Sequence, residues 1–161
     1  MRDSEYQWLN EMFYEEEDLV DYLPIKEQRR YCSQDNVLFV QYVVAHELEV
    51  SVPAMGYGGD YLWDVFEREM RGGNPTNDLG VYFPFPEAEV PSIFVLNETT
   101  YLSVLLHEVA HHVAAEKGWD ESGDGQGVAP PTKHHGPLFL KALKEVYTAY
   151  YNVSIRSKEQ E

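Results

Sequence analysis

The chain has 161 residues, a formal net charge of −16 at pH 7 and 43% hydrophobic residues, a composition that suits one globular domain with its own core. The acidic excess disfavours binding to nucleic acid, because a phosphate-binding surface needs clustered lysine and arginine. The single cysteine, Cys32, excludes an internal disulfide framework and a cysteine-rich zinc module.

The sequence has no recognisable targeting or membrane segment. Residues 1–5 lack the apolar core of a signal peptide, and no run approaches the roughly 18 apolar residues of a membrane span. We therefore expect a soluble cytoplasmic protein that does not bind membranes. The sequence leaves its oligomeric state open.

Residues 1–75 are expected to be mainly helical. Residues 5–23 have the pattern of an acidic amphipathic helix. Residues 36–52 combine strand-forming residue types with a helical spacing of valine and leucine, and the length of the segment favours a helix. A turn region is expected at 53–59 and a short helix at 60–70.

Two short strands are expected next along the chain. Residues 80–85 and 92–96 are apolar segments joined by a proline-bearing loop, which predicts a hairpin. An edge strand of such a hairpin could pair with an extended peptide and lay it beside the helix predicted to follow at residues 100–117. The simpler interpretation is that the hairpin only covers the helix, and the sequence does not choose between the two.

The most informative segment is a helix predicted at residues 100–117. Its leucine, valine and alanine residues recur at helical spacing, and no proline interrupts it. Asn97, Thr99 and Thr100 offer capping oxygens ahead of the apolar pattern, and Gly118 is a natural stop after it.

This helix carries the pattern H-E-x-x-H. Residues four apart lie on one face of a helix, so His107 and His111 can direct their imidazoles at one ion, with Glu108 close beside them. Zinc binds histidine nitrogen, and a catalytic zinc site keeps one position for water. Because an adjacent carboxylate can take the proton of that water, Glu108 is the expected catalytic base.

A catalytic zinc needs a third protein ligand, and the segment HHGPLF at 134–139 supplies the best candidate. His135 stands just before a helix predicted to begin at Pro137 and to run to about residue 152. His134 is its main competitor. Four carboxylates are weaker candidates, three in the glycine-rich segment 119–133 and one in the middle of the last helix: Asp120, Glu121, Asp124 and Glu145.

Other histidine patterns are given different roles. His112 points about 100° away from the metal-binding pair, so we expect it to be packed or to support the ligands from behind. His46 also precedes a glutamate, but Val50 stands where a second ligand would be needed, so His46 is expected to be structural or solvated. The extended pattern H-E-x-x-H-x-x-G-x-x-H is excluded, because Ala114 and Lys117 occupy its last two fixed positions.

Together, the segments LLHEVAHH and HHGPLF resemble small zinc metallohydrolases of bacteria and phages, which carry H-E-L-A-H followed by H-G-P-x-F. The two-part pattern is also similar to that of SprT-like metallopeptidases. The resemblance covers about residues 80–147. It implies that His107, His111 and His135 bind zinc, that Glu108 is the base, and that the fold is a minimal zincin-like domain. SprT-like proteins often add a cysteine zinc module, which this chain lacks.

These observations predict one α+β domain over residues 1–161, mostly helical, with a small β-hairpin or sheet beside the zinc-binding helix. The metallopeptidase-like core is expected at 80–152.

We expect a Zn²⁺-dependent hydrolase, a metallopeptidase in which zinc-activated water attacks a peptide or protein substrate and Glu108 is the general base. The alternative is a metal-binding interaction protein without catalytic activity. Glu108 favours the enzyme, because a structural zinc needs no base beside its ligands. A DNA-associated protease is disfavoured by the acidity.

Overall fold

The computed structural model describes residues 30–59, 80–85, 88–119 and 137–159. The elements in chain order are α4 (Gln34–Glu47), β1 (Ala54–Tyr57), β2 (Gly80–Phe83), β3 (Ser92–Val95), α6 (Leu102–Glu116) and α7 (Pro137–Glu159). The expected α+β class is confirmed. The helices predicted at 5–23 and 60–70 and most of the segment 119–133 lie outside the described residues.

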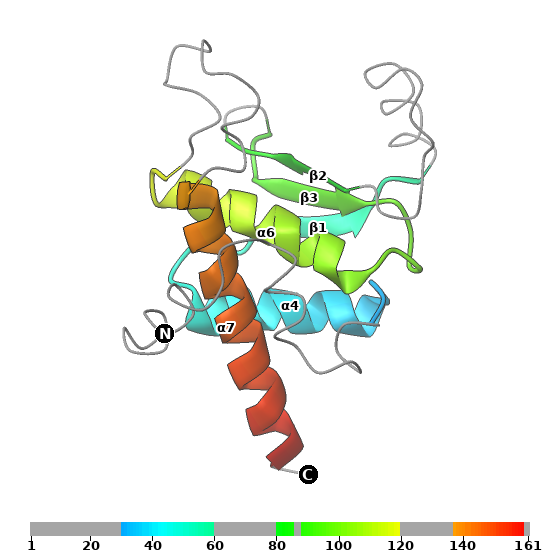
Figure 1. Cartoon of the computed structure of the whole chain (residues 1–161). Coiled ribbons are helices and arrows are strands. Elements are labelled where there is room, and N and C mark those ends of the chain that lie inside the picture. Colours follow the sequence, from blue (N-terminus) through cyan, green and yellow to red (C-terminus); the bar gives the residue numbers. More distant parts are fainter. Residues whose placement is uncertain (1–29, 60–79, 86–87, 120–136, 160–161) are drawn as a thin grey trace.

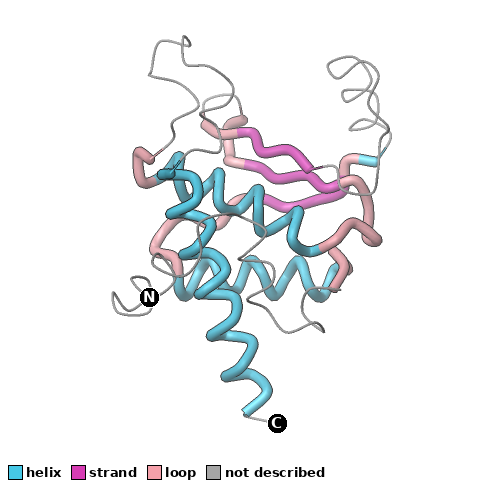
Figure 2. Tube along the Cα trace, in the orientation of Figure 1, coloured by secondary structure: helices cyan, strands magenta, loops and turns pink. Residues whose placement is uncertain are grey.

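Helix α6 lies at the centre of this arrangement. It packs against β2 and β3 on one side and against α7 on another, and α7 also contacts α4. Figure 2 shows the three strands together on one side of α6, with α4 on the opposite side. Helix α6, which carries the H-E-x-x-H pattern, therefore packs against the sheet on one side and against α7 on another.

The sheet has the strand order β1-β3-β2. Strands β2 and β3 pair antiparallel, with Tyr82 opposite Ile93, so the predicted hairpin is confirmed. Strand β1 pairs parallel with β3, with Met55 also opposite Ile93. The expectation of a simple turn region at 53–59 was therefore wrong. The segment is too short and too rich in glycine to show a strand pattern, and its extended form depends on the distant partner β3.

Helix α4 occupies the segment whose residue types were ambiguous. The side chain of Ser33 accepts a hydrogen bond from the Asn36 amide and caps the helix, and its inward face is apolar. The helix ends at Glu47 and not near residue 52, because Glu49 takes a left-handed backbone conformation with φ 54°. This turn brings Ser51 to the side chain of His112 on α6.

The two ends of α6 are stabilised differently. The expected side-chain caps were wrong: within the described residues, no side chain caps the helix, and Tyr101 occupies the N-cap position. Instead, residues 30–32 pair with 100–102, and the amide of Leu102 donates to the carbonyl of Arg30 at 2.9 Å. At the other end the prediction holds, because Gly118 has φ 73°, a conformation that glycine adopts without a steric penalty.

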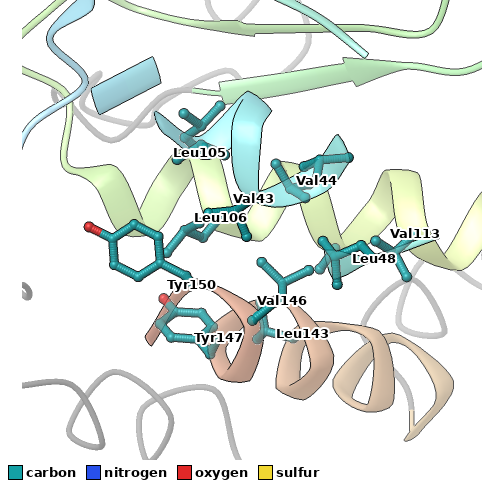
Figure 3. Close-up of a cluster of buried hydrophobic side chains, with 14 of the residues drawn as sticks. Val43, Val44, Leu48, Leu105, Leu106, Val113, Leu143, Val146, Tyr147 and Tyr150 are labelled. Atoms are coloured by element: carbon teal, nitrogen blue, oxygen red, sulfur yellow. The ribbon is translucent and has the colours of Figure 1, made fainter. Parts of the chain in front are cut away.

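Helix α7 extends beyond the predicted end near residue 152 and continues to Glu159. Its inward side joins α4 and α6 in one apolar cluster, in which side chains from three helices meet (Figure 3). The labelled members are Val43, Val44, Leu48, Leu105, Leu106, Val113, Leu143, Val146, Tyr147 and Tyr150.

None of the helices in the described part of the chain combines the length and apolar character needed to cross a membrane.

Truncating a central side chain of this cluster should destabilise the protein. Leu106 is 2% exposed, so Leu106→Ala removes buried methyl groups and leaves a cavity that costs about 2–5 kcal/mol of unfolding free energy. Leu38 on α4 is 62% exposed, and Leu38→Ala should change stability by no more than about 0.5 kcal/mol. Urea unfolding of both variants measures the difference, and equal losses would contradict the described core.

The thiol of Cys32 should be protected in the folded protein. It is fully buried, donates to the carbonyl of Tyr101 at 3.5 Å, and burial raises its pKa from 9.0 to about 12. A disulfide reagent at pH 8 should therefore label Cys32 only after unfolding. Between about pH 9 and about pH 12 the thiol keeps its proton in the folded state and loses it in the unfolded state. The free energy of unfolding should therefore fall as the pH rises through this range. Cys32→Ala should lose that part of the pH dependence, and rapid labelling of the native wild type would contradict the burial.

Candidate metal centre

The H-E-x-x-H residues lie on one well-defined helix. The imidazole rings of His107 and His111 have centroids 5.0 Å apart with an interplanar angle of 73°, and both side chains are half-buried. Two imidazoles bound tetrahedrally to one zinc, with Zn–N bonds of about 2.0–2.1 Å, have centroids about 5 Å apart. The spacing of the pair therefore fits two ligands of one ion.

The beginning of α7 closes against this pair. The ring of Phe139 lies 4.9 Å from the ring of His107 and 4.4 Å from that of His111, measured between centroids. Phe139 itself is buried, with 4% of its surface exposed. The second half of the sequence pattern, HHGPLF, thus brings its phenylalanine directly to the two histidines of the first half.

The predicted third ligand lies outside the described residues, as do its competitor His134 and the loop carboxylates Asp120, Glu121 and Asp124. Within the described ranges, no three histidine, cysteine or acidic side chains are grouped so that they could hold a metal ion. Glu145 is engaged elsewhere, because its carboxylate lies 3.5 Å from the ammonium group of Lys117. Burial raises the pKa of Glu145, and Lys117 opposes that rise.

Glu108 lies on the side of α6 that faces the sheet. It is 9% exposed, and Gly80 at the start of β2 lies directly against it. A Cβ atom added to Gly80 would stand 3.2 Å from Cγ of Glu108 and 2.8 Å from Cγ1 of Val104. The strand can approach the helix this closely only because residue 80 has no side chain.

His112 is fully buried and uses both ring nitrogens. Its Nε2 lies 2.6 Å from the carbonyl oxygen of Ser51, and its Nδ1 lies 2.9 Å from the hydroxyl of Tyr82. A carbonyl can only accept, so Nε2 carries the proton and the neutral ring accepts the Tyr82 hydroxyl proton at Nδ1. Burial lowers the pKa of His112 and so favours this neutral form. The hydrogen bond to Ser51 and the charge of Glu116 oppose that decrease.

The structure also agrees with the roles expected for His112 and His46, the two described histidines outside the H-E-x-x-H pattern. His112 is packed in the interior, as expected, and His46 is exposed on α4, where its ring lies 4.2 Å from that of Tyr42 between centroids. Sequence reasoning missed the contacts of Gly80, Tyr82 and Ser51. A glycine that opens an apolar strand was the only available signal, and it did not indicate which helix the strand approaches.

No protein-family model matches this sequence, and comparisons with curated proteins and with solved structures gave no match.

Proposed function

We propose that this protein is a zinc-dependent hydrolase, a metallopeptidase with a minimal zincin-like domain. In this proposal His107, His111 and His135 hold Zn²⁺, and Glu108 is the general base for hydrolysis of a peptide or protein substrate. The observation that carries it is the pair of imidazoles with centroids 5.0 Å apart, next to a buried carboxylate on the same helix.

The position of α7 supports a third ligand from the segment before it. Phe139 in the first turn of α7 lies against both imidazoles. His135 precedes Pro137, the first residue of α7, by two peptide units, which span at most about 7 Å. This short connection allows a histidine of the 134–135 pair to be the third ligand, and the resemblance to H-G-P-x-F metallohydrolases favours His135.

The donor types fit the metal. Neutral imidazoles are good zinc ligands, and three of them leave one coordination position for water. When bound, zinc would lower the pKa of that water and polarise the substrate carbonyl. The half-buried state of His107 and His111 fits a site that is shielded on one side, by Phe139, and is still accessible to a substrate.

The chain itself supplies the proton transfer. Glu108 belongs to the same H-E-x-x-H pattern as the two imidazoles, and its burial against Gly80 restricts the positions that its carboxylate can take. The carboxylate accepts a proton from the attacking water and passes it to the departing amine. A structural metal site has no use for this group.

The sheet offers a place for the substrate. Within the described sheet β2 is an outer strand, and its first residue, Gly80, contacts Glu108. An extended peptide that pairs with the outer edge of β2 would pass the catalytic base at this glycine. This proposal gives the hairpin a substrate-binding role beyond covering the helix.

Metal analysis tests the ligand set. The purified protein should contain about one zinc per chain, and His107→Ala/His111→Ala should remove it. His135→Ala should also strongly reduce the zinc content, whereas His134→Ala and the exposed control His46→Ala should keep it. Loss of zinc in His134→Ala with retention in His135→Ala would transfer the third ligand to His134. Full zinc in the double variant would refute the site.

Replacement of Glu108 tests the enzymatic proposal. Glu108→Gln keeps the size of the side chain but removes its basicity, so it should bind zinc normally and hydrolyse peptides at least about 10²-fold more slowly. Cleavage of a library of quenched fluorescent peptides, read by fluorescence and mass spectrometry, measures the rate. Glu98→Gln, at an exposed residue ahead of α6, is the matched control and should retain wild-type activity.

Two outcomes would count against the peptidase. Equal cleavage by wild type and Glu108→Gln would show that Glu108 is not the base. Zinc bound without cleavage of any peptide by the wild type would favour the alternative, a metal-binding interaction protein.

A further inference from the structure

Strand β2 and helix α6 contact each other at two matched positions. Gly80 lies against Glu108, and two residues later Tyr82 bonds His112, four residues further along the helix. Two strand residues advance by about 6.6–6.8 Å and four helical residues by about 6 Å, so the two contacts can form together along one line.

The first contact depends on close approach. A Cβ atom added to Gly80 would stand only 3.2 Å from Cγ of Glu108. The backbone of β2 therefore lies directly beside the carboxylate side chain. A small shift of β2 along or away from α6 would open space at Glu108 and allow it other rotamers. The position of the carboxylate therefore depends on what holds the strand in place.

The second contact holds the strand. The Tyr82 hydroxyl donates to Nδ1 of His112, and the opposite nitrogen of the same ring donates to the carbonyl of Ser51 in the α4–β1 connection. The imidazole is thus tied on both sides, and it is completely enclosed. It cannot turn toward a displaced Tyr82 without losing the bond to Ser51.

We infer that Tyr82 and His112 are positioning residues for Glu108. Their hydrogen bond fixes the position of β2 along α6. Gly80 therefore stays packed against the Glu108 side chain and holds its carboxylate in one position. The inference rests on the proposed function, since it assigns these residues a role in hydrolysis. A misplacement of about 1 Å in a reacting group can cost about 10²-fold in rate, so a loosened carboxylate should be visible in turnover.

The direct test compares two tyrosines of the same sheet. Tyr82→Phe removes the hydroxyl that bonds His112, and Tyr57→Phe removes a hydroxyl on β1 that donates to the carbonyl of Cys32 at 2.7 Å. Both variants lose one hydrogen bond, but only Tyr82 lies on β2, the strand whose Gly80 packs against Glu108. On the quenched fluorescent peptide that the wild type cleaves fastest, Tyr82→Phe should keep its zinc and KM and lose about 10-fold or more in kcat, whereas Tyr57→Phe should keep kcat.

A second readout needs neither metal nor substrate. In metal-free protein, the backbone amides of residues 80–83 should exchange with deuterium faster in Tyr82→Phe than in wild type, because the strand has lost the hydrogen bond from Tyr82 to His112 on α6. Tyr57→Phe should leave the exchange of these amides unchanged.

Glycine substitutions test the same inference from the strand side. Gly80→Ala adds a methyl group 2.8 Å from Val104 and should lower kcat without loss of zinc, because the strand and Glu108 must move apart. Gly56→Ala on β1 is the matched control, since its new methyl group would lie 3.5 Å from Phe94, an ordinary contact distance, and kcat should stay unchanged.

The outcomes separate the two claims. If the wild type cleaves peptides faster than Glu108→Gln but Tyr82→Phe has the kcat of Tyr57→Phe, the positioning role is overturned and the proposed function stands. The positioning role is also overturned if the amides of residues 80–83 exchange with deuterium at the same rate in Tyr82→Phe and in wild type. If wild type and Glu108→Gln are equal, the proposed function itself fails, and the positioning role fails with it.

Discussion

The structure depends on the close contact between β2 and α6. A helix and a strand normally keep their backbones apart by the thickness of their side chains, but the absence of a side chain at Gly80 removes that spacer. The approach buries Glu108, and it also brings Tyr82 within hydrogen-bonding distance of His112. One missing side chain thus creates both the enclosure of the carboxylate and the bond that maintains it.

The remaining sides of α6 have different partners, and each matches the chemistry of the residues that it faces. The apolar side packs against α4 and α7 and forms the core (Figure 3). The side with His107 and His111 meets Phe139, a ring that can cover imidazoles without competing as a ligand. The same fifteen-residue helix therefore contributes to folding stability and to the candidate metal centre.

The proposed chemistry needs a carboxylate that is close to the metal, restrained in position and not a ligand. In the described structure Gly80 of β2 packs against this carboxylate side chain, and the helix that carries it contributes Leu105, Leu106 and Val109 to the core. A site built on such rigid elements holds its groups more precisely than one built on loops alone. The formal net charge of −16 disfavours a function that requires binding to nucleic acid.

By itself, the sequence determined what depends on local spacing. The helical repeat places His107 and His111 on one face, Gly118 ends that helix, and both follow from neighbours within a few residues. The tertiary structure alone decided the contacts across long stretches of chain. The extended form of β1 depends on its pairing with β3. Tyr82 forms a hydrogen bond with His112, which is thirty residues further along the chain. Such contacts leave no periodic pattern in the sequence, because each is selected by the packing of whole elements and not by the residues beside it.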